Sequence, residues 1–424
     1  MNTQEKYKKY VNTAFVKAVE PIVVDRAKGS TYYDEEGKPF IDCFAGISVT
    51  NSGHGNERVL AAAKSQMDKL VHCCSYVYHV KPVGDLAETL ARITPGRLNK
   101  SFFGNGGAEA IEGAIRLAKR YTNKSESIAL TQSFHGRTYA TLSLTGNAGR
   151  KLGGGPYMPG VAFAPSPNCY RCPFKIYDSE KCDMACAQYL DDVIRCHTSQ
   201  DVAFFISEPI MGEGGIIVPP KNYFKTIKEI CEKYGVLFIA DEVQSGFCRT
   251  GKMFAIEHFD VEPDIMTMAK GIAGGFPLSC FIARDEIADA FQPGDHLSTF
   301  GGNPVSCAAS LANIEFMEQE TLAEQAEAKG EILKKALAEI NPKDVVIGEI
   351  RGKGLMIGME LVEDAQTKEP ATAKAAGIRA ALREQGVLIG VGGGFGNVLR
   401  LQPPLTISPE ELDTVVAKMK AIMA

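Results

Sequence analysis

Two residues of this chain suit covalent and acid–base chemistry on a small molecule. Lys270 follows a segment at residues 264–268 that reads as a buried strand, with Ala269 between them. A lysine at the end of a buried strand is costly unless it is paired or converted to an imine, although it can also extend its amine to solvent. Asp241 follows a second apolar run at residues 236–240, where an acidic residue faces a ligand or caps a helix.

Two further features suit anions. The glycine-rich turn at residues 104–107 precedes a helix-like segment that begins near Ala108, so its free amides and the helix dipole can bind a phosphate. Arg400 lies in the apolar run 398–402 and needs a carboxylate partner, from the protein or from a substrate. A lysine that forms an imine, an aspartate, a phosphate site and a carboxylate-binding arginine are together what pyridoxal phosphate chemistry requires.

The segments that position these residues alternate between strand-like and helix-like patterns from about residue 100 to residue 310. Several strand candidates are apolar on consecutive residues, which is typical of strands buried on both faces of a sheet. The alternation predicts an α/β fold with a mostly parallel sheet covered by helices. The strand candidates are residues 100–103, 127–131, 202–207, 236–240, 264–268 and 279–283.

Both ends of the chain show a different pattern. A hairpin signal surrounds Glu36 and Gly37, and the C-terminal part mixes helix-like with strand-like runs. We therefore predict a large domain over residues 51–311 and a small α+β domain built from residues 1–50 and 312–424. The C-terminal runs are a long charged helix at 311–340, a strand at 355–362, a helix at 371–385, and strands at 387–391 and 398–402.

Charge and hydropathy exclude several classes of partner. The 424 residues include 46 Lys and Arg against 51 Asp and Glu, a net charge of −5 without a block of like charge. Nucleic acid and anionic membranes are therefore poor candidate partners. No run approaches the ~18 apolar residues of a membrane span, and the first ten residues lack the apolar core of a signal peptide. We expect a cytoplasmic protein with mostly reduced cysteines.

Seven groups of motifs resemble those of the class III (ω-type) aminotransferases, pyridoxal phosphate enzymes of fold type I, over nearly the whole chain. The resemblance implies a large cofactor domain with a mostly parallel sheet, a small α+β domain from both termini, and pyridoxal 5'-phosphate as cofactor. The motifs are residues 105–112, 133–138, 207–210 with 212–215, 241–246 with 249–251, 269–271, 299–304 and 399–404.

The resemblance also implies roles for individual residues. Lys270 binds the cofactor as a Schiff base and then moves a proton as general base and acid, while Asp241 keeps the pyridine nitrogen protonated. The family usually carries Ser or Thr where this chain has Ala108, so one hydroxyl ligand to the phosphate is lost and weaker cofactor binding is expected. The other implied cofactor contacts are Gln244 to the ring hydroxyl, Phe134 and Val243 on the ring faces, the Gly107 and Ala108 amides on the phosphate, His135, Glu208, and Thr299 of a neighbouring subunit.

Substrate binding is implied at four positions. Arg400 is expected to bind the α-carboxylate of the 2-oxo acid, and Glu208 is similar to the gate glutamate that pairs with this arginine. Arg137 is a second candidate for a substrate carboxylate, or a structural residue. Ile47, where ornithine-type members carry tyrosine, favours a donor without a distal α-amino group.

The expected activity is transfer of an amino group from an amino acid or ω-amino acid to a 2-oxo acid in a ping-pong cycle. The donors to test are 4-aminobutyrate, β-alanine, alanine and taurine. The alternative is a pyridoxal-phosphate-dependent amino-acid racemase or epimerase of the same family. The expected assembly is a homodimer with shared active sites, and whether dimers pair into a tetramer is left open.

Four cysteines have a spacing that is separate from this chemistry. Cys169, Cys172, Cys182 and Cys186 form the pattern C-x2-C-x9-C-x3-C. Such arms can bind zinc or an iron–sulfur cluster, but the same residues can be free thiols or a redox pair. The aminotransferase chemistry itself needs no metal.

Overall fold

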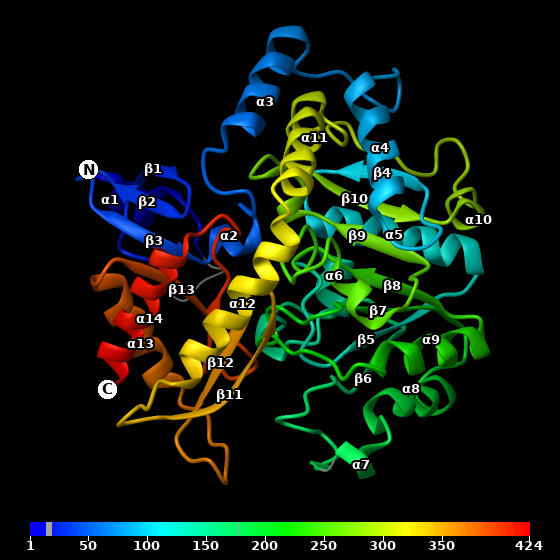
Figure 1. Ribbon diagram of the computed structural model, residues 1–424. Helices are drawn as coiled ribbons and strands as arrows, with labels where there is room; N and C mark the ends of the chain where they lie inside the picture. Colours follow the sequence, from blue (N-terminus) through cyan, green and yellow to red (C-terminus); the bar gives the residue numbers. More distant parts are fainter. Residues whose placement is uncertain (14–18, 178) are drawn as a thin grey trace.

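The computed structural model describes residues 1–13, 19–177 and 179–424. Two seven-stranded sheets organise these residues, and helices cover both of them (Figure 1). The first sheet comes from the middle of the chain and the second from the two ends. The expected mixed α/β fold is thus confirmed, while the domain boundaries near residues 51 and 311 stay a prediction.

The first sheet is mostly parallel, as predicted. Its order is β4-β10-β9-β8-β7-β5-β6, and β10 alone in this sheet runs against its neighbours. The short strand β6 carries no strong sequence signal and was missed. The strands are β4 (Lys100–Gly104), β5 (Glu126–Leu130), β6 (Val161–Ala164), β7 (Val202–Ser207), β8 (Leu237–Asp241), β9 (Ile265–Met268) and β10 (Ser279–Ala283).

Helices cover both faces of this sheet because successive side chains of each buried strand point to opposite sides. In β7, Phe204 and Ile206 belong to an apolar cluster with α5 (Gly107–Thr122), whereas Phe205 belongs to a cluster with α8 (Ala185–Cys196) and α9 (Tyr223–Tyr234). This double burial explains why the strands are apolar on consecutive residues. The other helices of this region are α3 (Glu57–Lys69), α4 (Lys81–Ile93), α6 (Tyr139–Leu144), α7 (Ser179–Cys182) and α10 (Asp285–Ala288), with 3-10 turns η1 (Ala148–Arg150), η2 (Ala255–Phe259) and η3 (Lys270–Ala273).

The second sheet joins the two ends of the chain through one parallel pair, β3 with β13. Its order is β1-β2-β3-β13-β14-β12-β11, and Figure 1 shows the blue N-terminal strands beside the orange C-terminal ones. The strands are β1 (Val24–Lys28), β2 (Thr31–Asp34), β3 (Pro39–Cys43), β11 (Val346–Lys353), β12 (Met356–Val362), β13 (Val387–Gly392) and β14 (Val398–Leu401), and the helices of the ends are α1 (Thr3–Tyr10), α2 (Ala45–Ser48), α13 (Thr372–Glu384) and α14 (Pro409–Met423).

The long charged helix expected at residues 311–340 is two helices. The first, α11 (Pro304–Gln319), packs on α3 and α4 of the first sheet's layer. The second, α12 (Leu322–Ala338), packs on β11 and β12 of the second sheet. Thr321 between them has a left-handed backbone with φ of +49°. A single non-glycine residue in this conformation ends one helix and redirects the next, and no local sequence signal marks it.

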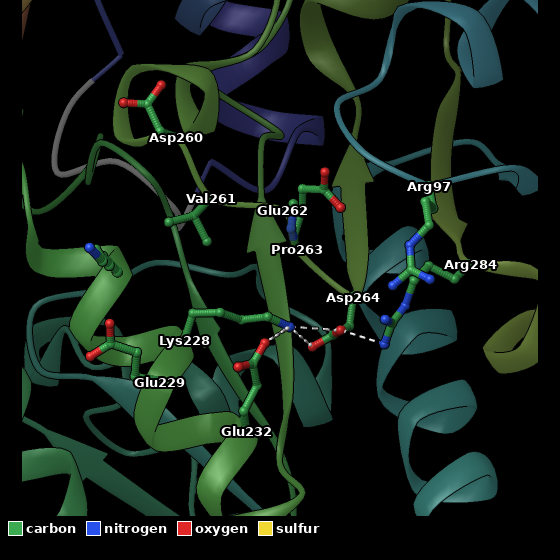
Figure 2. A pocket seen from close by; sticks show the side chains of 11 residues that line it. Arg97, Lys228, Glu229, Glu232, Asp260, Val261, Glu262, Pro263, Asp264 and Arg284 are labelled. Atoms are coloured by element: carbon green, nitrogen blue, oxygen red, sulfur yellow. Dashed lines mark hydrogen bonds and ion pairs between the residues drawn. The ribbon is translucent and has the colours of Figure 1, made fainter.

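A charged network closes the first sheet at the amino ends of its parallel strands. Asp264, immediately before β9, accepts hydrogen bonds from Lys228 at 2.9 Å, from Arg284 at 2.6 Å and from the Phe238 amide at 2.7 Å. Figure 2 shows Lys228 and Arg284 on either side of this carboxylate. The network borders a hollow of about 270 Å³. Because ligands of parallel sheets bind at the opposite, carboxyl ends of the strands, we assign this network to stability.

Candidate active site

A cavity of about 530 Å³ lies at the carboxyl ends of the parallel strands. Strands β7, β8 and β9 end at its wall in Ser207, Asp241 and Met268, and the residues that follow these ends line the cavity. This position is the usual ligand site of an open α/β sheet. The predicted residues that line it are Gly107, Ala108, Phe134, His135, Arg137, Glu208, Asp241, Val243, Gln244 and Lys270.

Asp241 is held in place from three directions. It is 2% exposed at the end of β8. Its Oδ1 accepts hydrogen bonds from the Val243 amide at 3.1 Å and from the Thr267 hydroxyl at 3.3 Å. Its Oδ2 lies 2.7 Å from Nδ1 of His135, which donates to it. The carboxylate therefore keeps one orientation, and the His135 ring connects it to the loop that carries Phe134.

Lys270 begins the turn η3 immediately after Ala269, with φ of +49°. Burial of the amine lowers the pKa of Lys270, and the nearby carboxylates of Asp241, Glu208 and Glu213 oppose this shift. A lysine with a lowered pKa has more of the neutral amine that attacks a carbonyl group. This shift agrees with Schiff-base chemistry at Lys270, which stays a prediction.

The loop before α5 provides backbone amides at the other side of the cavity. α5 begins at Gly107 without a side-chain cap, and Gly107 and Ala108 line the cavity. The first amides of a helix lack partners within the helix, so they can bind an anion. A Cβ atom on Gly107 would lie 2.8 Å from Cγ1 of Val243. Only glycine therefore lets this loop approach so close to the residue that follows Asp241.

Glu208 fastens two loops of the cavity together. Its Oε1 accepts a hydrogen bond from the Phe134 amide at 3.0 Å, and its Oε2 accepts one from the Gly212 amide at 2.8 Å. Burial raises the pKa of Glu208 to about 7, against a smaller lowering by His135. Both oxygens are used by backbone donors, so the side chain is committed to these loops.

The gate prediction for Glu208 is wrong, because a neighbouring glutamate takes that place. Arg400, 4% exposed on β14, donates from Nη1 to Oε2 of Glu213 at 3.2 Å. Glu213 also forms an ion pair with Arg150. Burial raises the pKa of Glu213, but Arg400 and Arg150 lower it by more, so the pKa of this carboxyl lies below its usual value. The family resemblance covers the motif at residues 212–215 but implied no role for Glu213, and no role was predicted for Arg150.

Three predicted residues, Arg400, Ile47 and Thr299, are not among the residues that line this cavity. Ile47 is in α2, where residues 45–48 all have positive φ, and its side chain is 39% exposed. Val49, two residues later, lines the cavity instead. Thr299 is exposed and does not line the cavity of its own chain. Its expected role toward a neighbouring subunit stays a prediction.

The four spaced cysteines are free thiols. Burial raises the pKa of Cys186 to about 12, and smaller contributions from Cys169, Cys182 and Cys172 indicate that the four side chains lie near one another. Over residues 1–13, 19–177 and 179–424, no group of three or more His, Cys, Asp or Glu side chains is arranged to hold a metal ion. Metal binding by Cys169, Cys172, Cys182 and Cys186 stays a prediction.

The cavity fits pyridoxal phosphate. It combines an amine of lowered pKa, a buried carboxylate, free helix amides and the apolar side chains of Phe134 and Val243, which are the groups that this cofactor needs. Nε2 of His135 is buried at the cavity wall with no hydrogen-bond partner among the described residues. The volume of the cavity, about 530 Å³, lies within the ~300–1,000 Å³ range of small-molecule sites.

Comparison with known proteins agrees with this fit. The family model described as aminotransferase class III matches residues 14–423. A leucine/methionine racemase of Thermococcus litoralis is 40% identical, over 99% of this chain and 94% of its own length. A probable 4-aminobutyrate aminotransferase of Bacillus subtilis is 38% identical, over 99% of this chain and 96% of its own. A Bacillus anthracis aminotransferase structure superposes with a TM-score of 0.92 at 36% identity, covering 100% of this chain and 99% of that one.

None of the helices in the described part of the chain has the length and apolar character needed to span a lipid bilayer.

Proposed function

The chain belongs to the class III aminotransferases, which use pyridoxal 5'-phosphate, and from this premise we propose how its residues perform amino transfer. The observation that carries the proposal is the placement of Lys270 and Asp241 on one cavity at the ends of adjacent strands, with Arg400 close enough to lower the pKa of Lys270. The bound cofactor supplies an electron sink for the carbon–hydrogen bond beside the substrate nitrogen.

Lys270 moves the proton. Its Nζ would accept the proton from the substrate carbon and deliver it to the cofactor, and the lowered pKa of Lys270 favours the neutral amine that this step needs. Asp241 keeps a negative charge facing the pyridine nitrogen, and His135 holds that carboxylate in place. Phe134 and Val243 would exclude water from the bound cofactor, and Gln244 would bind its ring hydroxyl.

Arg400 binds the carboxylate of the amino acid or 2-oxo acid. In the structure it is paired with Glu213, which must leave Arg400 before a substrate carboxylate can bind. Arg137 lies exposed at the mouth of the same cavity and binds the distal carboxylate of an ω-amino acid. This division of labour lets one pocket accept two unlike substrates in turn.

The substrates that this arrangement fits are small amino acids or ω-amino acids and 2-oxo acids. A coupled assay should test alanine, 4-aminobutyrate, β-alanine and taurine against pyruvate, glyoxylate and 2-oxoglutarate. We expect turnover with at least one pair of donor and acceptor. The reaction should divide into two half-reactions, one that needs only the donor and one that needs only the acceptor. Absence of turnover with every pair, in protein that retains its yellow cofactor, would contradict the proposal.

Racemisation is the second candidate, because a leucine/methionine racemase is 40% identical to this chain. A racemase returns the proton to the opposite face of the same carbon and needs no 2-oxo acid. Chiral analysis of L-alanine and L-leucine incubated without an acceptor separates the two. Inversion at the α-carbon supports racemisation, and retention supports amino transfer alone.

Replacing Ala108 by Ser should tighten cofactor binding about tenfold. The hydroxyl adds a charge-assisted hydrogen bond to the phosphate at the first turn of α5, where the helix dipole already favours an anion. Titration of the apoprotein with pyridoxal phosphate measures the change. Ala61→Ser, on the exposed side of α3, is the matched control and should leave the dissociation constant unchanged. An unchanged or weaker constant for Ala108→Ser would count against phosphate binding at this helix end.

We also propose that two chains form a dimer in which each supplies Thr299 to the other's phosphate site. The exposure of Thr299 and its distance from its own cavity support this.

A further inference from the structure

Three charged side chains meet beside the cavity. Glu213 forms an ion pair with Arg400 on one oxygen and with Arg150 on the other. The side chains of Arg400, Glu213 and Arg150 are 5%, 18% and 28% exposed. One carboxylate between two guanidinium groups leaves a net charge of +1, so this end of the cavity stays attractive to anions even while Glu213 is paired.

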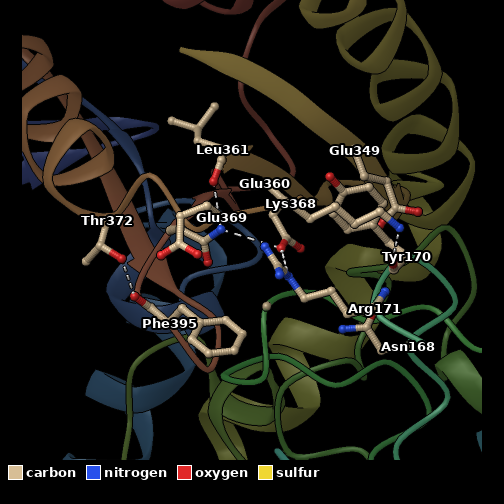
Figure 3. Close-up of polar contacts among 12 residues, drawn as sticks. Asn168, Tyr170, Arg171, Glu349, Glu360, Leu361, Lys368, Glu369, Thr372 and Phe395 are labelled. Atoms are coloured by element: carbon tan, nitrogen blue, oxygen red, sulfur yellow. Dashed lines mark hydrogen bonds and ion pairs between the residues drawn. The ribbon is translucent and has the colours of Figure 1, made fainter. Parts of the chain in front are cut away.

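The backbone of the Glu213 loop is fixed by the second sheet. Gly393 donates to the Glu213 carbonyl at 3.0 Å, and Arg351 donates from Nη2 to the Gly215 carbonyl at 2.7 Å. Arg351 is itself paired with Glu360 at 2.7 Å, and Glu360 also pairs with Arg171. Figure 3 shows Glu360 and Arg171 within this group of polar contacts. Only the side chain of Glu213 is thus left to move when Arg400 is released.

Arg150 is presented by a well-anchored turn. It ends η1, whose cap Asn147 accepts a hydrogen bond from the Gly149 amide at 3.1 Å. The Asn147 amide donates to the carbonyl of Ser133 at 3.2 Å, directly before Phe134. The guanidinium of Arg150 is therefore placed relative to the cofactor side of the cavity without depending on the second sheet.

We propose that Arg150 retains the Glu213 carboxylate when this leaves Arg400, and so sets how easily the pocket accepts an α-carboxylate. A part-buried carboxylate without a partner is costly. If Arg400 were the only cation beside Glu213, the carboxylate would therefore leave Arg400 only at a high cost in free energy. Here Glu213 loses its ion pair with Arg400 but keeps the one with Arg150, so its carboxylate stays paired throughout. This inference rests on the proposed function of Arg400 and makes Arg150 a positioning residue that acts through Glu213.

The consequence is a preference among donors. An α-amino acid places its carboxylate at Arg400 and needs the gate open, whereas an ω-amino acid reacts with Glu213 still on Arg400. A gate that opens at low cost favours alanine and similar α-amino acids. We therefore expect Arg150→Met to lower the ratio of kcat/KM for alanine to kcat/KM for 4-aminobutyrate about tenfold, because each kcat/KM reports only the half-reaction of its own donor.

A binding experiment separates this role from turnover. Propionate carries a carboxylate and no amine, and it can be titrated into the cofactor-loaded enzyme by the change in cofactor absorbance. Arg150→Met should raise the dissociation constant of propionate about tenfold, the size expected for one charge-assisted contact. Arg150→Lys keeps the charge and should recover most of the affinity. Arg195→Met, on an exposed part of α8, is the control and should match the wild type.

The Glu213→Gln background distinguishes the mechanism. Without the gate carboxylate, Arg150→Met should change propionate affinity less than about twofold, because Arg150 then has nothing to retain. An equal loss in both backgrounds would mean that Arg150 binds the carboxylate itself, and no loss in either would mean that it is a surface residue. Both results would overturn the proposal. Failure of amino transfer would leave the propionate titration unaffected, so the two proposals can fail separately.

Discussion

Lys270→Ala should lower kcat by at least about 10^4-fold, because the variant lacks both the amine that binds the cofactor and the base that moves the proton. Among the described residues that line the cavity, Lys270 is the one lysine, so no other lysine can replace it. Steady-state turnover with an active donor and acceptor pair measures the loss. Borohydride reduction followed by intact mass measurement should attach one cofactor to the wild type and none to the variant.

Lys221→Ala is the matched control, since Lys221 is exposed and away from the cavity. It should retain wild-type turnover and the mass of one reduced cofactor. Turnover of Lys270→Ala within tenfold of wild type, or cofactor attached to the variant at another lysine, would contradict the assignment of Lys270.

Asp241→Asn should lower kcat on the order of 10^2–10^3-fold and weaken cofactor binding. The amide removes the charge that keeps the pyridine nitrogen protonated, and it also disturbs the pair with His135 at 2.7 Å. Rapid mixing with donor alone should show the slowing in the proton-transfer phase. The dissociation constant of the cofactor, measured on the apoprotein, should rise in parallel.

Asp68→Asn changes the same group at an exposed position of α3 and should have no effect on either quantity. A second variant, His135→Gln, leaves the Asp241 charge in place and should cost less than Asp241→Asn. If His135→Gln slowed the proton-transfer phase as much as Asp241→Asn, the orientation of the carboxylate and not its charge would be the main contribution.

The sequence by itself determined the cofactor side of the site. Lys270, Asp241 and the turn at residues 104–107 each follow a strand-like segment, and the segment at 236–240 before Asp241 is apolar on every residue. Such runs are local signals of strands buried on both faces, and the carboxyl ends of parallel strands meet at one edge. Residues that directly follow these strands must therefore lie near one another, whatever the loops between them do.

The carboxylate side of the site was decided by the tertiary structure. Glu208 and Glu213 are five residues apart in one loop, and nothing in their spacing says which one reaches Arg400. Glu208 is taken by the amides of Phe134 and Gly212, which leaves Glu213 to pair with Arg400 and Arg150.

These partners come from three segments far apart in the chain, and their meeting depends on how the second sheet docks against the first. The chain turns at Thr321, so that helix α12 packs on the second sheet. Arg351 of β11, in that sheet, binds the Glu213 loop. Whether two distant loops form an ion pair depends on the relative position of the two sheets to within a few ångströms. The apolar pattern of a strand, in contrast, is present in consecutive residues of the sequence. For this reason local sequence predicted the cofactor side of the site, whereas only the packed structure brought Glu213 and Arg150 to Arg400.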